Sequence, residues 1–136
     1  MTYNEKRNFL GRYGYSIRRV KNLNRELEEW RTIATNITQK LTPVTVKNHD
    51  NESKVERCAI RISEIEKDIL EEISAAEEYR EQITVAVEGI KDTRRRELIE
   101  MRYITGLSVN NIAGIIGKDE DNIYKMIRKT IRSMDI

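Results

Sequence analysis

The stretch Gly106–Met134, GLSVNNIAGIIGKDEDNIYKMIRKTIRSM, decides the fold that we predict for this chain. Ser108 is suited to N-cap a short helix, because its hydroxyl can accept a hydrogen bond from a backbone N–H of the first turn. Gly117 ends that helix, since glycine adopts a positive φ without steric cost. Asp119 offers a second N-cap, and apolar residues at three- and four-residue spacings follow over Ile123–Met134. The stretch therefore predicts two short helices joined by a tight turn.

A third predicted helix, Arg94–Ile104, precedes this pair and completes a small unit with it. Leu98 and Met101 lie about one turn apart and form its inward face. Three short helices with a tight turn between the last two have the geometry of a helix-turn-helix, in which one helix can enter a DNA major groove. A unit of about 45 residues buries too little surface to be comfortably stable alone. We therefore expect residues 92–136 to form a domain that packs against the rest of the chain or a partner.

A seven-residue apolar repeat fills the middle of the chain, and such a repeat over five heptads is typical of a coiled coil. Ser53 is suited to N-cap this helix and Glu56 to complete a capping box, so the helix is predicted over Lys54–Ile90. The repeat consists of Val55, Ile62, Ile69, Ala76, Ile83 and Ile90, and the position three residues later holds Cys58, Ile65, Glu72, Tyr79 and Ala86. Glu72 is the single polar member.

A first long helix is predicted from Asn4 to Leu41, because its apolar residues also follow a three-four spacing. Pro43 ends this helix, and the polar connector over about residues 42–53 can reverse the chain. Two amphipathic helices joined by a reversal predict an antiparallel, coiled-coil-like hairpin domain over residues 1–91. The predicted fold class is therefore all-α, with this hairpin followed by the three-helix helix-turn-helix domain.

Charge is unevenly distributed, although the net charge of the chain is only +2. Residues 1–25 carry seven basic side chains and one acidic side chain, a net charge of +6. Residues 66–88 carry eight acidic and two basic side chains, a net charge of −6. We expect these two segments to face each other in the hairpin.

The sequence offers little that supports catalysis, a cofactor or a metal site. Cys58 and His49 are the one cysteine and the one histidine, so they form neither an intrachain disulfide nor a metal-binding cluster of these residues. Paired carboxylates such as Glu71 and Glu72 have no accompanying nucleophile or base. No apolar run approaches the roughly 18 residues of a membrane span, and the first residues lack the apolar core of a signal peptide. We expect a cytoplasmic protein that is not an enzyme and uses no cofactor, metal or membrane.

The segment Arg94–Met134, RRRELIEMRYITGLSVNNIAGIIGKDEDNIYKMIRKTIRSM, resembles region 4 of bacterial sigma factors. It also resembles the C-terminal part of ArpU-like phage late-transcription regulators, in which a helical half precedes a sigma-like helix-turn-helix. The resemblance rests on Met101–Tyr103, Gly106–Ser108, Ile112–Ala113, Ile116–Gly117, Ile123 and Arg128–Met134. Over the preceding residues it rests on size and helical layout only. It implies a sequence-specific regulator of phage or prophage genes that binds double-stranded DNA and contacts RNA polymerase.

The same resemblance implies a set of DNA-binding residues in the last third of the chain. Asn122 can pair with adenine and Lys125 with guanine, while the arginines before the third helix suit phosphates or form a solvated helix start. The implied set is Arg94, Arg95, Arg96, Ser108, Glu120, Asp121, Asn122, Tyr124, Lys125, Arg128, Lys129 and Arg132.

The chain departs from the family pattern at two places. Lys118 stands after the turn glycine, where the family usually has an apolar residue. The second helix opens with Asp119, Glu120 and Asp121, where serine or threonine followed by a polar or basic residue is more common. Acidic groups at a helix N-terminus stabilise the helix dipole but repel DNA phosphates. These carboxylates must therefore lie away from the DNA backbone or accept hydrogen bonds from cytosine amino groups.

Two other functions remain open from the sequence. One is the small subunit of a phage packaging terminase, whose ring assembly native mass would reveal. The other is an interaction module that binds polymerase or another regulator without DNA. We also expect a homodimer, because the apolar stripes are wider than one hairpin needs. The residues that widen them are Leu23, Trp30, Ile33, Ile37, Ile73 and Val87.

Overall fold

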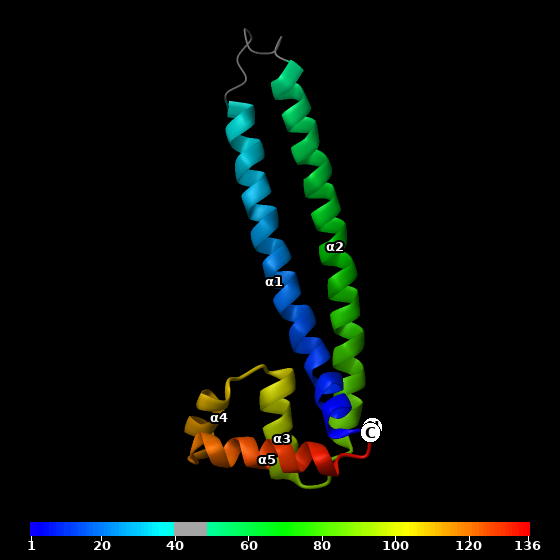
Figure 1. Ribbon diagram of the computed structural model, residues 1–136, viewed down its shortest axis with the longest axis vertical. Helices are drawn as coiled ribbons and strands as arrows, with labels where there is room; N and C mark the ends of the chain where they lie inside the picture. Colours follow the sequence, from blue (N-terminus) through cyan, green and yellow to red (C-terminus); the bar gives the residue numbers. More distant parts are fainter. Residues whose placement is uncertain (40–48) are drawn as a thin grey trace. The chain divides into compact units, whose positions relative to one another are not determined.

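The computed structural model describes the backbone of residues 1–39 and 49–136, and the side chains of residues 1–39 and 53–136. These residues form helices and no strand, which confirms the all-α prediction (Figure 1). The elements are α1 (Tyr3–Gln39), α2 (His49–Glu88), α3 (Thr93–Ile99), the π-helix η2 (Glu100–Ile104), α4 (Val109–Ile116) and α5 (Glu120–Ser133).

The predicted hairpin is present, because the long helices α1 and α2 pack against each other. Contacts divide the chain into two compact units. Unit 1 comprises residues 1–17 and 75–136, and unit 2 comprises residues 18–74. This division differs from the domains expected from the sequence, because the start of α1 and the end of α2 share a core with the three C-terminal helices.

Unit 1 has a continuous apolar core to which every helical segment of the unit except η2 contributes fully buried side chains, and η2 packs partly buried ones against it. Leu10 of α1 is 0% exposed and lies in the same cluster as residues of α4 and α5. Burying a leucine or isoleucine side chain stabilises a fold by roughly 1.5–3 kcal/mol. The buried members are Leu10, Ile83, Val87, Ile90, Leu98, Ile99, Val109, Ile112, Ile123, Ile127, Ile131 and Met134.

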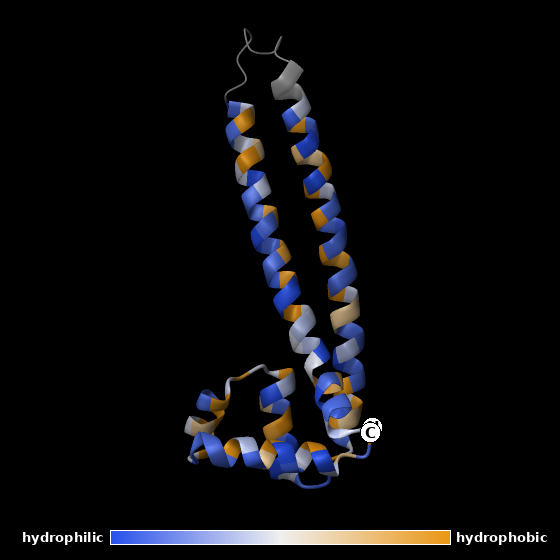
Figure 2. Ribbon diagram, viewed as in Figure 1, coloured by the Kyte–Doolittle hydropathy of each residue, from blue (hydrophilic) through white to orange (hydrophobic). Residues whose placement is uncertain are grey.

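Unit 2 has a narrow apolar seam between two helices. Leu23 and Leu27 of α1 are buried against Ile65 and Ile69 of α2, and Cys58 is also buried. Figure 2 shows apolar residues recurring along both long helices between hydrophilic ones. This seam agrees with the predicted seven-residue repeat on α2.

Two residues expected at an interface between chains are buried inside this one. Leu23 lies in the seam of unit 2 and Val87 in the core of unit 1, because both face the other long helix. Ile33 and Ile73 remain 43% and 38% exposed.

The predicted start of α2 is wrong. The helix begins at His49 instead of Lys54, so Ser53 lies inside the helix and is not its N-cap. The backbone carbonyl of Ser53 accepts from Nε of Arg57 at 3.3 Å, as part of the helix surface. The predicted end of α1 at Leu41 and the breaker Pro43 lie outside the described residues.

The third predicted helix is present but changes its winding. Residues of α3 are α-helical, and Glu100–Ile104 form a π-helix in which the Thr105 N–H donates to the Glu100 carbonyl at 2.9 Å. A π-helical turn widens the backbone locally, and such turns are frequent at functional sites. Arg102 of this turn donates from Nη1 to the Leu107 carbonyl at 3.1 Å, which fixes the loop before α4.

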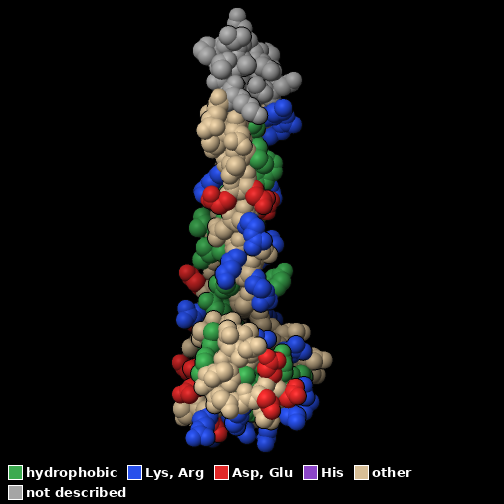
Figure 3. Space-filling view, turned by 90° about the vertical axis from the view of Figure 1, so that its left-hand side faces the viewer, with side chains coloured by type: hydrophobic (Ala, Val, Ile, Leu, Met, Phe, Trp, Pro, Cys, Tyr) green, Lys and Arg blue, Asp and Glu red, His purple; other side chains and the backbone are tan. Residues whose placement is uncertain are grey.

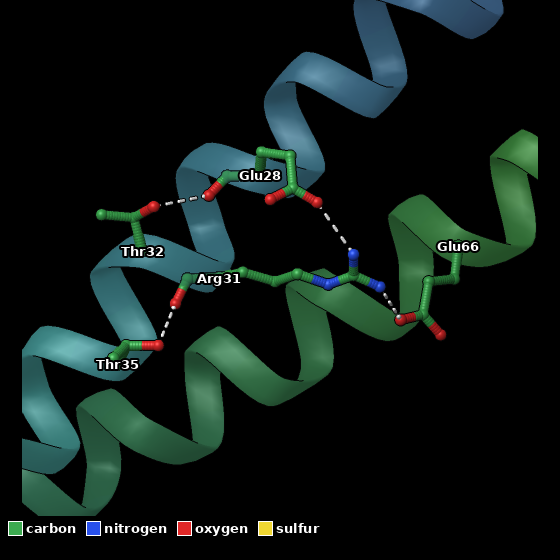
Figure 4. A network of polar contacts seen from close by, with 5 residues as sticks. All are labelled: Glu28, Arg31, Thr32, Thr35 and Glu66. Atoms are coloured by element: carbon green, nitrogen blue, oxygen red, sulfur yellow. Dashed lines mark hydrogen bonds and ion pairs between the residues drawn. The ribbon is translucent and has the colours of Figure 1, made fainter.

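Ion pairs hold the polar edges of unit 2. Arg31 of α1 pairs with Glu28 on the same helix at 2.9 Å and with Glu66 on α2 at 3.4 Å (Figure 4). Arg61 of α2 pairs with Glu26 on α1 at 2.6 Å. The hydrogen bonds that Arg61 donates to Glu26 and to Glu64 raise the pKa of its guanidinium group. The guanidinium groups of unit 2 therefore link the two helices.

The basic segment, residues 1–25, and the acidic segment, residues 66–88, contact each other only partly through ion pairs. Among the described residues, one ion pair joins them, between Arg19 and Glu72 at 3.4 Å. Elsewhere the cations stack on aromatic rings, with Arg12 over Tyr79 at 5.7 Å and Arg80 over Tyr13 at 5.9 Å.

Candidate nucleic-acid interface

The turn between α4 and α5 is fixed by backbone hydrogen bonds. Ser108 Oγ accepts from the Asn111 N–H at 3.1 Å and so caps the start of α4, as predicted. Gly117 has a φ of 80°, and its N–H donates to the Ala113 carbonyl at 2.8 Å. The Lys118 N–H donates to the same carbonyl at 3.2 Å. The end of α4 is therefore satisfied within the turn, and the start of α5 is held close to it.

The second predicted cap is also present. Asp119 Oδ1 accepts from the Asn122 N–H at 2.8 Å and so starts α5. Glu120 and Asp121 follow in the first turn, where the helix dipole favours negative charge. The three acidic residues at the start of α5 thus have a structural role. One of them, Asp119, accepts a hydrogen bond from the backbone of the helix.

Helix α5 divides cleanly into a buried and an exposed face. Ile123, Ile127 and Ile131, each four residues apart, are buried in the core of unit 1. The opposite side, which we call the exposed face of α5, carries Asp121, Lys125, Arg128 and Arg132 at spacings of four, three and four residues. All four of these side chains are exposed. The exposed face is therefore a row of charged side chains on a helix whose other side is anchored.

The end of α5 is held by the first turns of α1. Lys6 Nζ donates to the Met134 carbonyl at 2.6 Å and to the Arg132 carbonyl at 3.2 Å. A cation at this position satisfies carbonyls that lack a partner within the helix and interacts favourably with the helix dipole. The Arg132 guanidinium also lies 5.3 Å from the centre of the Tyr3 ring. Helix α1 therefore orders the C-terminal turn of α5.

Tyr103 of η2 lies close to the same corner. Burial raises the pKa of its hydroxyl above the usual value, while the nearby charges of Arg102 and Arg7 partly oppose this shift. The neutral phenol is thus favoured in the folded state, as expected for a ring that packs against the core of unit 1.

The arginines before α3 have different surroundings. Asp92 Oδ1 accepts from the backbone N–H groups of Arg94 at 3.0 Å and Arg95 at 3.3 Å, which caps α3. Arg94 is exposed and Arg95 is half-buried. Arg96 donates from Nε to the Ile90 carbonyl at 3.0 Å and so ties α3 to the end of α2. Arg94 and Arg95 are therefore the two of these arginines whose guanidinium groups have no hydrogen-bond partner among the described residues.

Other residues of the implied set also differ in availability. The Ser108 hydroxyl already accepts from the backbone, as described above. Tyr124 is 49% exposed and leaves its ring partly open to solvent. Glu120, Asn122 and Lys129 are exposed on α5.

A groove of about 480 Å³ runs along the turn side of α5, and we call it the turn groove. Three lysines line it, together with the turn and one amide side chain. Lys118 Nζ lies 3.9 Å from Met126 Sδ, so its ammonium group reaches a half-buried residue of α5. The lining residues are Gly117, Lys118, Asp119, Asn122, Lys125, Met126 and Lys129.

The basic side chains of unit 1 have no acidic partners within the unit. The structure describes every residue of unit 1, and none of its Lys or Arg nitrogens lies within 4.0 Å of a carboxylate oxygen. The six ion pairs of the described residues all lie in unit 2. Figure 3 shows Lys and Arg side chains gathered at the lower edge of unit 1 in that view. No carboxylate of unit 1 therefore neutralises these cations, although Lys6, Arg96 and Arg102 donate to backbone carbonyls.

Three residues of this region were missed by the sequence reasoning as contributors to the site. Lys118 stood out only as a departure from the family pattern. Lys6 and Tyr3 are more than a hundred residues away from α5 in the chain, and Lys6 is separated by 128 residues from Met134. No local pattern predicts such pairs.

Comparison with protein-family models, with curated proteins and with solved structures found no match to this chain.

Proposed function

We propose that the chain is a sequence-specific, DNA-binding transcription regulator of phage or prophage genes, acting in the cytoplasm. In this proposal α5 enters the major groove and α4 braces it across the turn at Gly117. The observation that carries the proposal is the exposed face of α5. Its cations have no carboxylate partner within 4.0 Å inside unit 1, while caps and a buried face fix the helix beneath them.

The side chains divide into two classes of contact. Lys125 and Arg128 are placed in the middle of the exposed face, where they can read guanine, and Asn122 beside them can pair with adenine. Glu120 and Asp121 at the first turn can accept from cytosine amino groups. Phosphate contacts come from Arg94, Arg95, Lys129 and Arg132.

A single copy of the helix-turn-helix domain, residues 92–136, should bind DNA weakly, because its acidic and basic residues are nearly balanced. Residues 92–136 carry nine Lys and Arg against seven Asp and Glu, a net charge of 9 − 7 = +2. We propose that two copies pair through exposed apolar residues of the hairpin, since two half-sites bind more tightly than one. Ile60 and Leu70 of α2 are 60% and 69% exposed. A sedimentation measurement that gives a monomer at tens of micromolar would contradict this pairing.

Contact with RNA polymerase is a further part of the proposal. Co-purification of polymerase with the chain in the presence of a nuclease supports that contact. Co-purification that depends on DNA contradicts it. A native mass of a large ring would instead favour a packaging terminase subunit.

The DNA-binding test begins with selection of bound duplexes from a random pool. Fluorescence anisotropy then measures affinity for the selected duplex from ~50 to ~300 mM KCl, and the affinity should fall steeply with salt. Arg128→Ala should cost roughly 1–3 kcal/mol on the selected duplex and relax the preference at one position. Arg25→Ala, an exposed arginine of unit 2, is the matched control and should bind like the wild type. If no duplex is enriched and none binds at ~50 mM salt, the proposal fails.

A further inference from the structure

We infer that the turn groove is a binding site for one backbone phosphate of duplex DNA, and that Lys118 is its distinguishing residue. This inference rests on the proposed function and extends it by assigning Lys118 to the phosphate together with Lys129, while Lys125 and Asn122 also line the groove and keep the base contacts proposed above. Lys118, Lys125 and Lys129 line one groove with the amide side chain of Asn122. Ammonium and amide N–H groups are donors that suit a phosphodiester, which offers oxygen acceptors and one negative charge.

The charge of the turn groove is only partly neutralised from within, because three lysines line it with one carboxylate. Asp119 is the one carboxylate in the lining, and its Oδ1 already accepts from the Asn122 N–H at 2.8 Å. None of the three lysines lies within 4.0 Å of any carboxylate oxygen of the described residues. Lysines four residues apart on a helix are neighbours, so Lys125 and Lys129 repel each other. A bound anion relieves this repulsion.

The position of Lys118 follows from the turn. Gly117 has a positive φ and the Lys118 N–H is fixed on the Ala113 carbonyl, so the backbone direction at Lys118 is set by α4. The Lys118 ammonium then reaches Met126 of α5, with Nζ 3.9 Å from Sδ. The sulfur is a weak, uncharged acceptor, so the lysine keeps its positive charge within the lining of the groove.

The groove also lies on the correct side of α5 for a phosphate. A helix with its side chains is about 10–12 Å wide, close to the ~12 Å width of the major groove, so its flanks approach the backbones. Lys125 belongs both to the exposed face and to the turn groove, which places the groove on the flank of that face. A phosphate held there would fix how deeply α5 enters, without reading bases.

The test compares the full-length wild type with Lys118→Met, which removes the charge and keeps an unbranched side chain of similar length at this position. Anisotropy is measured with the selected duplex and with a shuffled duplex across a salt series. Lys118→Met should weaken both duplexes by the same factor, roughly 3- to 10-fold, and lower the slope of log affinity against log salt by about 0.9. Lys129→Met should act in the same way, and Lys21→Met, an exposed lysine of unit 2, should change neither quantity.

The possible results separate the two proposals. If the wild type binds but Lys118→Met keeps its affinity and salt slope, the phosphate site is overturned and DNA binding stands. If Lys118→Met changes the ratio between the two duplexes, Lys118 reads bases and the inference is also overturned. If the wild type binds neither duplex, both proposals fail. Equal thermal midpoints of the wild type and Lys118→Met show that the comparison concerns binding and not folding.

Discussion

Both compact units use the same two long helices, yet their charged side chains have different partners. In unit 2 the arginines Arg19, Arg31 and Arg61 pair with glutamates across the two helices. In unit 1 no Lys or Arg has a carboxylate partner among the residues that the structure describes, although acidic residues are present throughout the unit. Cations of unit 1 instead contact backbone carbonyls and aromatic rings, or face solvent. Ion pairs therefore link the two helices of unit 2, whereas the cations of unit 1 pair with no carboxylate of the described residues.

The two units also differ in how much apolar surface supports them. Unit 2 relies on a seam of four clustered residues, Leu23, Leu27, Ile65 and Ile69. Unit 1 has a core of twelve buried residues drawn from the start of α1, from the end of α2 and the residue Ile90 after it, and from the segment α3 to Met134. The larger core can hold surface charges in place without pairing them, and this difference suggests four experiments.

The largest expected effect comes from two leucines of α1 that belong to different units. Leu10→Ala should destabilise the chain by about 3–5 kcal/mol, because Leu10 is fully buried in the larger core and leaves a cavity that its neighbours cannot fill. Leu27→Ala should cost nearer to about 2 kcal/mol, since two helices can close around the gap. Urea unfolding measures both values. Equal costs would mean that the two cores are equally rigid.

A second experiment concerns two glycines of the α4 region. Gly117→Ala should cost about 1–2 kcal/mol, because an L-residue is strained at a φ of 80° even though a Cβ would meet no atom there. Gly114→Ala should instead stabilise α4 by about 0.5–1 kcal/mol, since Gly114 has no positive φ and open space around it. Thermal unfolding measures whether each variant is less or more stable than the wild type. If both variants lose stability, backbone strain at the turn is not the cause.

A smaller effect is expected where α1 holds the end of α5. Lys6→Met should cost about 1 kcal/mol, because the Met134 and Arg132 carbonyls lose a charged donor. Hydrogen exchange should rise in the last turn of α5 and remain unchanged in α4. Lys21→Met is the control, as Lys21 is exposed in unit 2. Unchanged hydrogen exchange in α5 would show that hydrogen bonds from water stabilise these carbonyls as well as those from Lys6.

The smallest effect is expected for the polar network of unit 2. Glu66→Gln removes one partner of Arg31 and should cost only about 0.2–0.5 kcal/mol, because both side chains are half exposed. The cost should vanish at ~1 M salt, where charges are screened. Denaturation at low and high salt measures the difference. A cost that persists in salt would indicate packing by the Glu66 stem instead of charge.

Much of the fold follows from local patterns in the sequence. Ser108, Gly117 and Asp119 act within four residues of their own positions, so the caps and turn of the helix-turn-helix were predictable from spacing. The seven-residue repeat on α2 likewise located Ile65 and Ile69 in the seam. These features depend on neighbours along the helix.

Other features depend on contacts that no local pattern records. The start of α2 was misplaced because Ser53 and Glu56 resemble a capping box, while the helix extends back to His49. The contacts of Lys6 and Tyr3 with α5 depend on the return of α1 beside the end of the chain's last helix. Lys118 was visible as an unusual residue, but its place in the turn groove required the crossing of α4 and α5.

The contact between Lys6 and the end of α5 also bears on the order of folding. It joins residues 128 positions apart, and closing a loop of that length costs conformational entropy before any contact repays it. Pairing of α1 with α2 shortens the loop that remains to be closed. We therefore expect the long helices to gain protection first in pulse-labelling hydrogen exchange and α5 to gain it last. A nascent chain would then acquire its candidate DNA-binding surface only after the final helix has been synthesised.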